Sequence, residues 1–243
     1  MIPIPAIDVK DGKVVRLIQG NFKEEKIYFD KPETVAKHFE EEGARRLHIV
    51  DLNGALEGTP KNAAHIEKIL KAVKIPVELG GGIRRIETAK FYLNMGVSWV
   101  IFGTKACLDR HFTQEAIAEF KGKAIVGIDA LNGFLATDGW TKITQTKAVE
   151  FAKNVEMLGC RTVIYTDIAK DGVLKGPNFQ EIKNISQSLS IDLIASGGVG
   201  SLADIKGLLA LGRPNIKGVI IGKALYENKF TMREAIGACS QKE

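Results

Sequence analysis

Two aspartates, Asp8 and Asp129, are the strongest candidates for chemistry, because each closes a short apolar run. One carboxylate can remove a proton from carbon while a second carboxyl group, kept protonated by its surroundings, delivers a proton to an oxygen. The pair therefore predicts acid–base catalysis, and the residues themselves leave open which of the two is the acid. For either aspartate alone, the stabilisation of a turn is an equally ordinary role.

Glycines follow several other apolar runs and indicate phosphate binding. A backbone can approach a phosphate closely, and offer its N–H groups, where no side chain intervenes. A simple turn is the alternative for one cluster, but two clusters predict a substrate that carries a phosphate at each end. The first cluster comprises Gly81, Gly82, Arg84, Gly103 and Thr104, and the second comprises Ser196, Gly197, Gly198, Gly222 and Lys223.

Four further residues are weaker candidates for contacts with the substrate: Arg16, Trp140, Thr166 and Asp167. Arg16 could pair with a phosphate, and Trp140 could stack over a ring. The alternatives are a solvated hairpin residue for Arg16 and a loop anchor for Trp140. Asp51, the repeat partner of Asp167, is as readily explained by the barrel architecture as by contact with the substrate. The four histidines show no ligand spacing, so no metal site is expected.

The elements that must position these residues are eight short, β-branched runs that alternate with amphipathic segments. The runs are residues 2–8, 47–51, 75–79, 99–103, 124–129, 162–167, 193–196 and 218–222, and the helical segments are 32–42, 63–73, 88–95, 147–158 and 201–211. Nearly continuous apolar strands require a parallel sheet with both faces covered, and eight of them can close without an edge. We therefore expect a single α/β domain over residues 1–243, a (β/α)8 TIM barrel. In such barrels the active site lies at the C-terminal ends of the strands.

The two halves of the sequence resemble each other, which predicts half-barrels of approximately residues 1–121 and 122–243. Ala6-Ile7-Asp8 matches Gly127-Ile128-Asp129, and Gly81-Gly82-Ile83 matches Gly197-Gly198-Val199. Each half thus contributes one aspartate and one glycine cluster, which favours the functional interpretation of both. An additional strand at residues 14–18 is expected to form a hairpin through Asp11-Gly12.

Composition narrows the class of partner. The 34 basic and 29 acidic residues are mixed along the chain, so the sequence shows no nucleic-acid-binding arm and favours small anionic molecules. No apolar stretch approaches the roughly 18 residues of a membrane helix, and an acid interrupts the apolar N-terminus where a signal peptide would continue. We expect a cytoplasmic monomer without membrane partners. The three cysteines suggest neither a disulfide framework nor a zinc site.

Several motifs closely resemble those of the phosphoribosylformimino-aminoimidazole carboxamide ribotide isomerases of histidine biosynthesis, over essentially the whole chain. They include Ile4-Pro5-Ala6-Ile7-Asp8, Val15-Arg16-Leu17 with Gln19-Gly20, Gly80-Gly81-Gly82-Ile83-Arg84, Ala136-Thr137-Asp138-Gly139-Trp140 and Tyr165-Thr166-Asp167-Ile168. The resemblance implies an Amadori rearrangement of an aminoaldose to an aminoketose, without a metal or organic cofactor. It also assigns the base to Asp8 and the acid to Asp129. Leu131 and Val173 depart from the family pattern, and both lie in predicted loops.

Three other functions compete with this interpretation. The cyclase subunit of imidazole glycerol phosphate synthase is similar in its aspartates and repeat, and Gly20-Asn21-Phe22 looks cyclase-like, but Pro5-Ala6-Ile7 does not. An isomerase that also accepts phosphoribosylanthranilate is left open by the sequence. A non-catalytic barrel that serves as a scaffold is disfavoured by the intact pair of aspartates.

Overall fold

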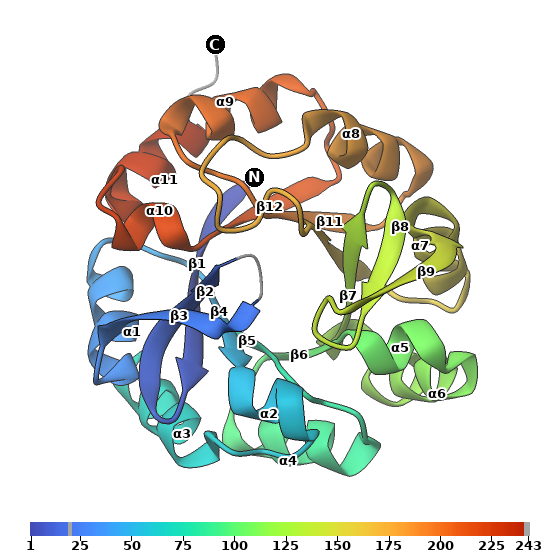
Figure 1. Cartoon of the computed structure of the whole chain (residues 1–243), viewed down its shortest axis with the longest axis horizontal. Helices are drawn as coiled ribbons and strands as arrows, with labels where there is room; N and C mark the ends of the chain where they lie inside the picture. Colours follow the sequence, from blue (N-terminus) through green and yellow to red (C-terminus); the bar gives the residue numbers. More distant parts are fainter. Residues whose placement is uncertain (19–20, 241–243) are drawn as a thin grey trace.

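Eight parallel strands close into a barrel in the computed structural model, which describes residues 1–18 and 21–240 (Figure 1). In ring order they are β1 (Ile2–Lys10), β4 (Leu47–Asp51), β5 (Val77–Gly80), β6 (Trp99–Phe102), β7 (Ala124–Leu131), β10 (Thr162–Asp167), β11 (Asp192–Ser196) and β12 (Ile216–Ile221). The ring closes because β1 pairs with both β4 and β12, and β10 pairs with both β7 and β11. The predicted (β/α)8 barrel is confirmed, and each predicted run overlaps one of its strands.

Helices surround the barrel between successive strands (Figure 1). The longer ones are α1 (Pro32–Glu41), α3 (Ala63–Ala72), α4 (Ile86–Met95), α6 (Arg110–Phe120), α7 (Ala148–Met157), α8 (Phe179–Ser188), α9 (Leu202–Ala210) and α11 (Met232–Ser240). Short helices directly follow some strands, namely α2 (Leu52–Glu57), α5 (Thr104–Leu108) and α10 (Lys223–Tyr226). The five predicted helical segments are confirmed. In the described ranges, none of the helices is both long and apolar enough to cross a membrane.

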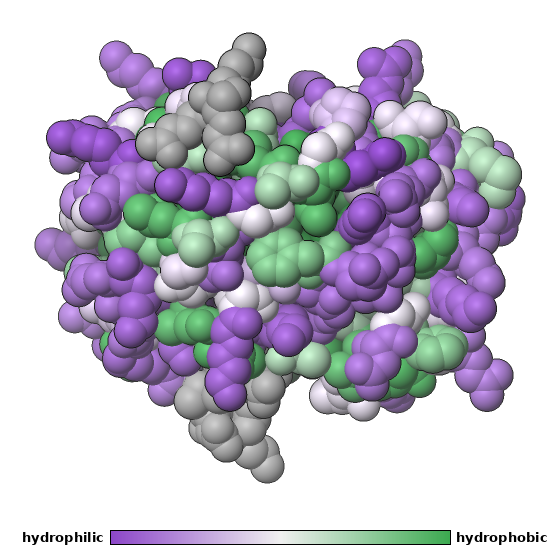
Figure 2. Space-filling model, turned by 90° about the horizontal axis from the view of Figure 1, so that it is seen from above, coloured by the Kyte–Doolittle hydropathy of each residue, from purple (hydrophilic) through white to green (hydrophobic). Residues whose placement is uncertain are grey.

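Side chains alternate between the two faces of each strand, which separates an outer core from a smaller inner one. The outer core lies between strands and helices, and it contains residues such as Leu47, Ile49 and Tyr165. The inner core fills the lower part of the barrel with Ile4, Ala6, Ile101, Ile125, Ile164, Ile194 and Ile220. Inward-pointing residues near the C-terminal ends of the strands therefore face the mouth of the barrel. The surface seen in Figure 2 is largely hydrophilic, with hydrophobic residues scattered over it.

Two hairpins extend the barrel at repeat-related positions. β1 turns into β2 (Lys13–Ile18) at Asp11 and Gly12, whose φ angles of +50° and +75° suit a type I′ turn. This predicted hairpin is confirmed, and β3 (Asn21–Phe29) adds a strand that the sequence analysis did not anticipate. Gln19 and Gly20, which belong to one family motif, lie outside the described residues.

The second hairpin was also not anticipated. It follows β7 and consists of β8 (Phe134–Thr137) and β9 (Lys142–Lys147), with Asn132 and Gly133 at its first turn. Asp138 and Trp140 both have positive φ angles, +53° and +71°, at the turn between these two strands. The Asp138 N–H donates a hydrogen bond to Thr104 Oγ1 at 3.0 Å, which fastens the turn to the end of β6. The hairpin thereby brings Trp140 to the mouth of the barrel.

Candidate active site

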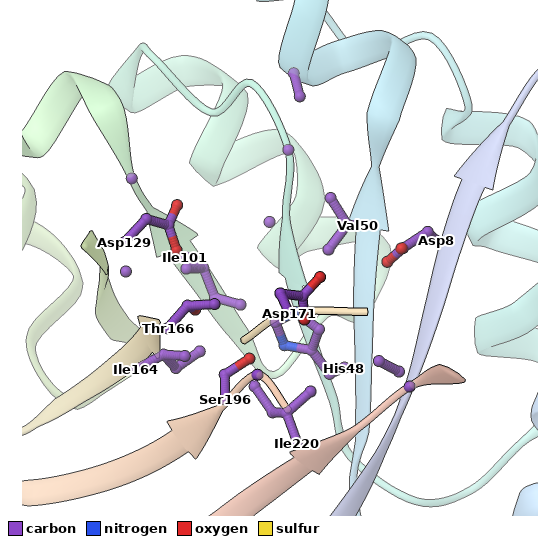
Figure 3. A pocket seen from close by; sticks show the side chains of 18 of the residues that line it. Asp8, His48, Val50, Ile101, Asp129, Ile164, Thr166, Asp171, Ser196 and Ile220 are labelled. Carbon is purple, nitrogen blue, oxygen red and sulfur yellow. The ribbon is translucent and has the colours of Figure 1, made fainter. Parts of the chain in front are cut away.

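A cavity of about 270 Å³ occupies the C-terminal mouth of the barrel. Asp8 on β1 and Asp129 on β7 lie on opposite sides of it, because these are the first and fifth strands of the ring (Figure 3). Apart from Asp167, every residue singled out from the sequence lines this cavity. These residues are Asp8, Arg16, Gly81, Gly82, Arg84, Gly103, Thr104, Asp129, Trp140, Thr166, Ser196, Gly197, Gly198, Gly222 and Lys223.

Asp8 is held by an ion pair with Arg16 of the adjoining strand β2. Arg16 Nη1 donates to Asp8 Oδ2 at 2.7 Å, and Arg16 Nη2 donates to the carbonyl oxygen of Ala6 at 3.2 Å. A Cβ atom at Gly222 would lie only 1.8 Å from Arg16 Nη2, so the glycine makes room for the guanidinium. Arg16 thus places a positive charge beside Asp8 and holds its carboxylate at the mouth of the barrel.

Two further carboxyl groups, Asp129 and Asp171, line the same cavity. Burial raises the pKa of Asp129, although hydrogen bonds from Trp140 and Thr166 favour its charged form. Burial also raises the pKa of Asp171 to about 6, and this rise is opposed by the positive charge of Arg16 and assisted by the negative charges of Asp8 and Asp129. Figure 3 shows Asp171 between Asp8 and Asp129. The site therefore combines one ion-paired carboxylate with two carboxyl groups whose environment favours a bound proton.

The first glycine cluster lies at the ends of β5 and β6, the third and fourth strands of the ring, and the second lies at the ends of β11 and β12, the seventh and eighth. The two clusters therefore face each other across the mouth. Gly82 and Gly198 have φ angles of +73° and +93°. A Cβ atom at Gly82 would lie 1.8 Å from the Gly54 oxygen, and one at Gly198 would lie 2.5 Å from the Gly176 oxygen. Glycine is therefore required by the backbone itself as well as by the proposed phosphate contacts.

Gly82→Ala should lower the free energy of unfolding by about 1–3 kcal/mol, because a side chain there meets both a positive φ and the backbone of α2. Urea denaturation measures this effect. Gly237→Ala is the matched control, since no atom lies within 4 Å of its Cβ position in α11. That variant should be neutral or slightly more stable. Equal stability of the two variants would contradict the packing described for Gly82.

Asp167 departs from the prediction, because it does not line the cavity. It follows the inward-facing Thr166 and so points to the outer face of β10. Its carboxylate accepts hydrogen bonds from Ala169 N at 2.9 Å and from Asn178 Nδ2 at 2.6 Å, within the loop that follows the strand. Asp167 thus has the architectural role that the sequence suggested for its repeat partner, Asp51.

Asp51, at the repeat-related position on β4, has the same role in a more elaborate form. It is fully buried, and its carboxylate accepts hydrogen bonds from Gly54 N, Lys61 N, Asn62 N and the Asn62 side chain at 2.7–3.1 Å. The two aspartates therefore organise the loops that surround the cavity, one in each half.

Asp51→Asn should lower the free energy of unfolding by about 2–3 kcal/mol, because the amide replaces one acceptor oxygen by a donor that faces backbone N–H groups. Chemical denaturation followed by circular dichroism measures this loss. Asp30→Asn provides the control, since Asp30 is 77% exposed and makes only a surface pair with Lys13. A loss no larger than that of the control would show that the Asp51 hydrogen bonds contribute little.

The sequence analysis missed His48 and Asp171, which both line the cavity. His48 occupies an inward position on β4, two residues before Val50, and the alternation along that strand could have revealed it. Asp171 lies in the irregular segment after β10, where no periodicity tells which side chains turn inward.

Comparisons with known proteins agree with this geometry. The model of the histidine biosynthesis protein family matches residues 2–231. Curated relatives named 1-(5-phosphoribosyl)-5-((5-phosphoribosylamino)methylideneamino)imidazole-4-carboxamide isomerase include one from Alkaliphilus metalliredigens, 47% identical over 98% of this chain and 99% of the relative. Another, from Syntrophus aciditrophicus, is 50% identical over 97% of this chain and 98% of the relative. A third, from Acinetobacter baylyi, is 48% identical over 97% and 96%, respectively. With its closed barrel and its paired carboxyl groups at the mouth, the chain belongs to the histidine biosynthesis protein family.

Proposed function

We propose that this protein is an intramolecular isomerase of histidine biosynthesis, which converts the bis-phosphorylated aminoaldose named for its relatives into the corresponding aminoketose. The single observation that carries the proposal is the cavity itself, in which Asp8 faces Asp129 and Asp171 between two opposed glycine clusters. Relatives about 48% identical over nearly the whole chain carry the name of this isomerase.

Binding rests on the two phosphates of the substrate. The end of β5 offers Gly81 and Gly82 with Thr104 nearby, and the end of β11 offers Gly197 and Gly198 with Lys223 nearby. Because these groups lie on opposite sides of the mouth, they hold a molecule with a phosphate at each end across the cavity. The reacting ribose then lies between the carboxyl groups.

The reaction needs one acid and one base. A carboxyl group protonates the ring oxygen of the aminoaldose, the bond from C1 to that oxygen breaks, and the lone pair of the nitrogen forms a Schiff base. Asp8 then removes the proton from C2, and the electrons of that bond form an enolamine. The enolamine gains a proton at C1 and loses the proton of its C2 hydroxyl group, which gives the ketose.

Asp129 is the acid that the family resemblance implies, and Asp171 is a second candidate. A pKa of about 6 leaves a fraction of Asp171 protonated at neutral pH. Burial raises the pKa of Asp129 as well, but hydrogen bonds from Trp140 and Thr166 oppose that rise. These observations favour Asp171 as the group that delivers the proton, with Asp129 as a neighbouring carboxyl group that orients the substrate.

An absorbance assay with the aminoaldose ribotide tests the proposal directly. Conversion by the purified protein without ammonia is the expected result, and ammonia-dependent ring closure would instead assign it to the cyclase. The same preparation, offered phosphoribosylanthranilate, tests for the second isomerase activity. We further propose that the protein acts as a monomer, and sedimentation equilibrium tests this.

A further inference from the structure

One layer inside the barrel differs in chemistry between the two halves. In the first half, His48 on β4 and Glu78 on β5 are register neighbours on the inner face. In the second half, the corresponding neighbours on β10 and β11 are Ile164 and Ile194. His48 and Ile164 are 116 residues apart, as are Glu78 and Ile194, which is the spacing of the internal repeat. The same structural position thus holds an ionisable pair in one half and an apolar pair in the other.

Arg46 and Trp99 complete the polar layer. Glu78 is fully buried, its Oε2 pairs with Arg46, and its Oε1 lies 2.7 Å from His48 Nδ1. The Arg46 guanidinium lies 3.9 Å from the centroid of the Trp99 ring, whose residue neighbours Glu78 in register on β6. Both oxygens of the carboxylate and the plane of the guanidinium are therefore held in place.

Barrel closure alone does not require this network. Removing charges from water is costly, and a well-packed apolar pair often stabilises a protein as much as a buried ion pair does. The isoleucine pair of the other half shows that this layer can be filled by apolar packing. The presence of His48, Glu78 and Arg46 in this layer must therefore depend on a property that isoleucine lacks.

That property is the control of which nitrogen of His48 carries the proton. A carboxylate accepts hydrogen bonds only, and Arg46 donates only. The hydrogen bond between Glu78 and His48 therefore requires a proton on Nδ1 of the imidazole. Nε2 lies on the other side of the ring from this contact, and His48 lines the cavity among Asp8, Asp129 and Asp171 (Figure 3).

We propose that Glu78 and Arg46 are positioning residues that keep the proton of neutral His48 on Nδ1 and so present Nε2 to the substrate as a hydrogen-bond acceptor. The inference rests on the proposed isomerase function. During the reaction the C2 hydroxyl group of the enolamine loses its proton as the C2 carbonyl forms and C1 gains a proton. An acceptor at Nε2 favours this step, because it withdraws the hydroxyl proton as the electrons of that O–H bond move into the carbonyl.

Glu78→Gln tests the proposal with little change in shape. Arg46 cannot accept a hydrogen bond, so the glutamine oxygen must face Arg46 and the amide NH2 must face His48. The amide then donates to Nδ1, and the proton of His48 moves to Nε2. Two-bond ¹⁵N–¹H correlation spectra of the ring nitrogens should show Nδ1–H in the parent protein and Nε2–H in the variant.

Kinetics provide the second measurement. A substrate hydroxyl group can accept as well as donate a hydrogen bond, so binding should persist when Nε2 becomes a donor. We therefore expect kcat to fall about tenfold to hundredfold with little change in KM. The proposal would be overturned if the spectra of the parent showed Nε2–H. It would also be overturned if Glu78→Gln moved the proton to Nε2 and left kcat unchanged. Absence of isomerase turnover in the parent would instead refute the proposed function, and the spectra would still report on Glu78.

Two additional variants separate positioning from folding. Ser186→Ala removes a fully buried hydroxyl group that binds Asn215, outside the residues that line the cavity, and should leave the His48 signals, kcat and KM unchanged. If Glu78→Gln does not fold, Arg46→Thr/Glu78→Ile replaces it, because Thr162 and Ile194 occupy these positions in the other half. This double variant should also lose the Nδ1–H form and turnover, and retention of either would overturn the proposal.

Discussion

Asp8→Asn should lower kcat by about 10²- to 10⁴-fold, because the amide cannot accept the proton of C2. The amide oxygen of asparagine can still accept a hydrogen bond from Arg16, which now lies 2.7 Å from the carboxylate, so the shape of the cavity should persist. The absorbance assay measures turnover, and calorimetric titration with the bis-phosphorylated ribotide measures binding.

Binding of the ribotide to the variant and to the parent distinguishes a loss of proton transfer from a loss of affinity. Binding of the ribotide should remain close to that of the parent, since the glycine clusters are untouched. A kcat within about tenfold of the parent would remove Asp8 from the role of base.

Asp171→Asn should cause a loss of similar size and should also change the dependence of kcat on pH. Its pKa of about 6 means that the acid form declines as the pH rises through this value. In the parent, kcat should therefore fall on the alkaline side of about pH 6, and this limb should disappear in the residual activity of the variant. If Asp129→Asn removes the alkaline limb and Asp171→Asn retains it, Asp129 is the acid.

The stability of the Asp171 variant offers an independent check on the same pKa. A carboxyl group whose pKa is raised in the folded state contributes stability that is present at low pH and is lost as the pH rises through about 6. Asparagine cannot ionise, so Asp171→Asn should have a larger free energy of unfolding than the parent at pH 7. This advantage over the parent should be smaller at pH 4, where Asp171 is protonated. Urea titrations at both pH values measure the difference. Lower stability at pH 7 would show that ionised Asp171 is well accommodated.

The features predicted from the sequence are those that repeat along the chain. Apolar runs of four to seven residues identify the strands, and polar residues that close them, such as Asp8 and Asp129, identify one end of the barrel. Asp167 shows the limit of this rule, because adjacent residues at a strand end point to opposite faces and only one of them reaches the cavity. The hairpin of β8 and β9 and the position of Asp171 depend on irregular backbone, for which the sequence has no periodic signal.

His48 illustrates a different limit. Its inward direction follows from strand alternation, but its chemistry depends on Glu78 and Arg46, which are brought beside it by strand register. The register of parallel strands is determined by packing over the whole barrel and cannot be obtained from the local sequence. The position of the proton on Nδ1 could therefore not be predicted from the sequence.

We expect the difference between the His48–Glu78 pair and the Ile164–Ile194 pair to affect the orientation in which a substrate binds. Two similar glycine clusters on opposite sides of one mouth can receive a molecule with two terminal phosphates in either of two orientations. We expect the reacting ribose to meet the imidazole of His48 in one orientation and the isoleucine side of the same layer in the reversed orientation. The two orientations therefore differ in free energy, so the polar half of the barrel limits non-productive binding in a site that is otherwise nearly symmetric.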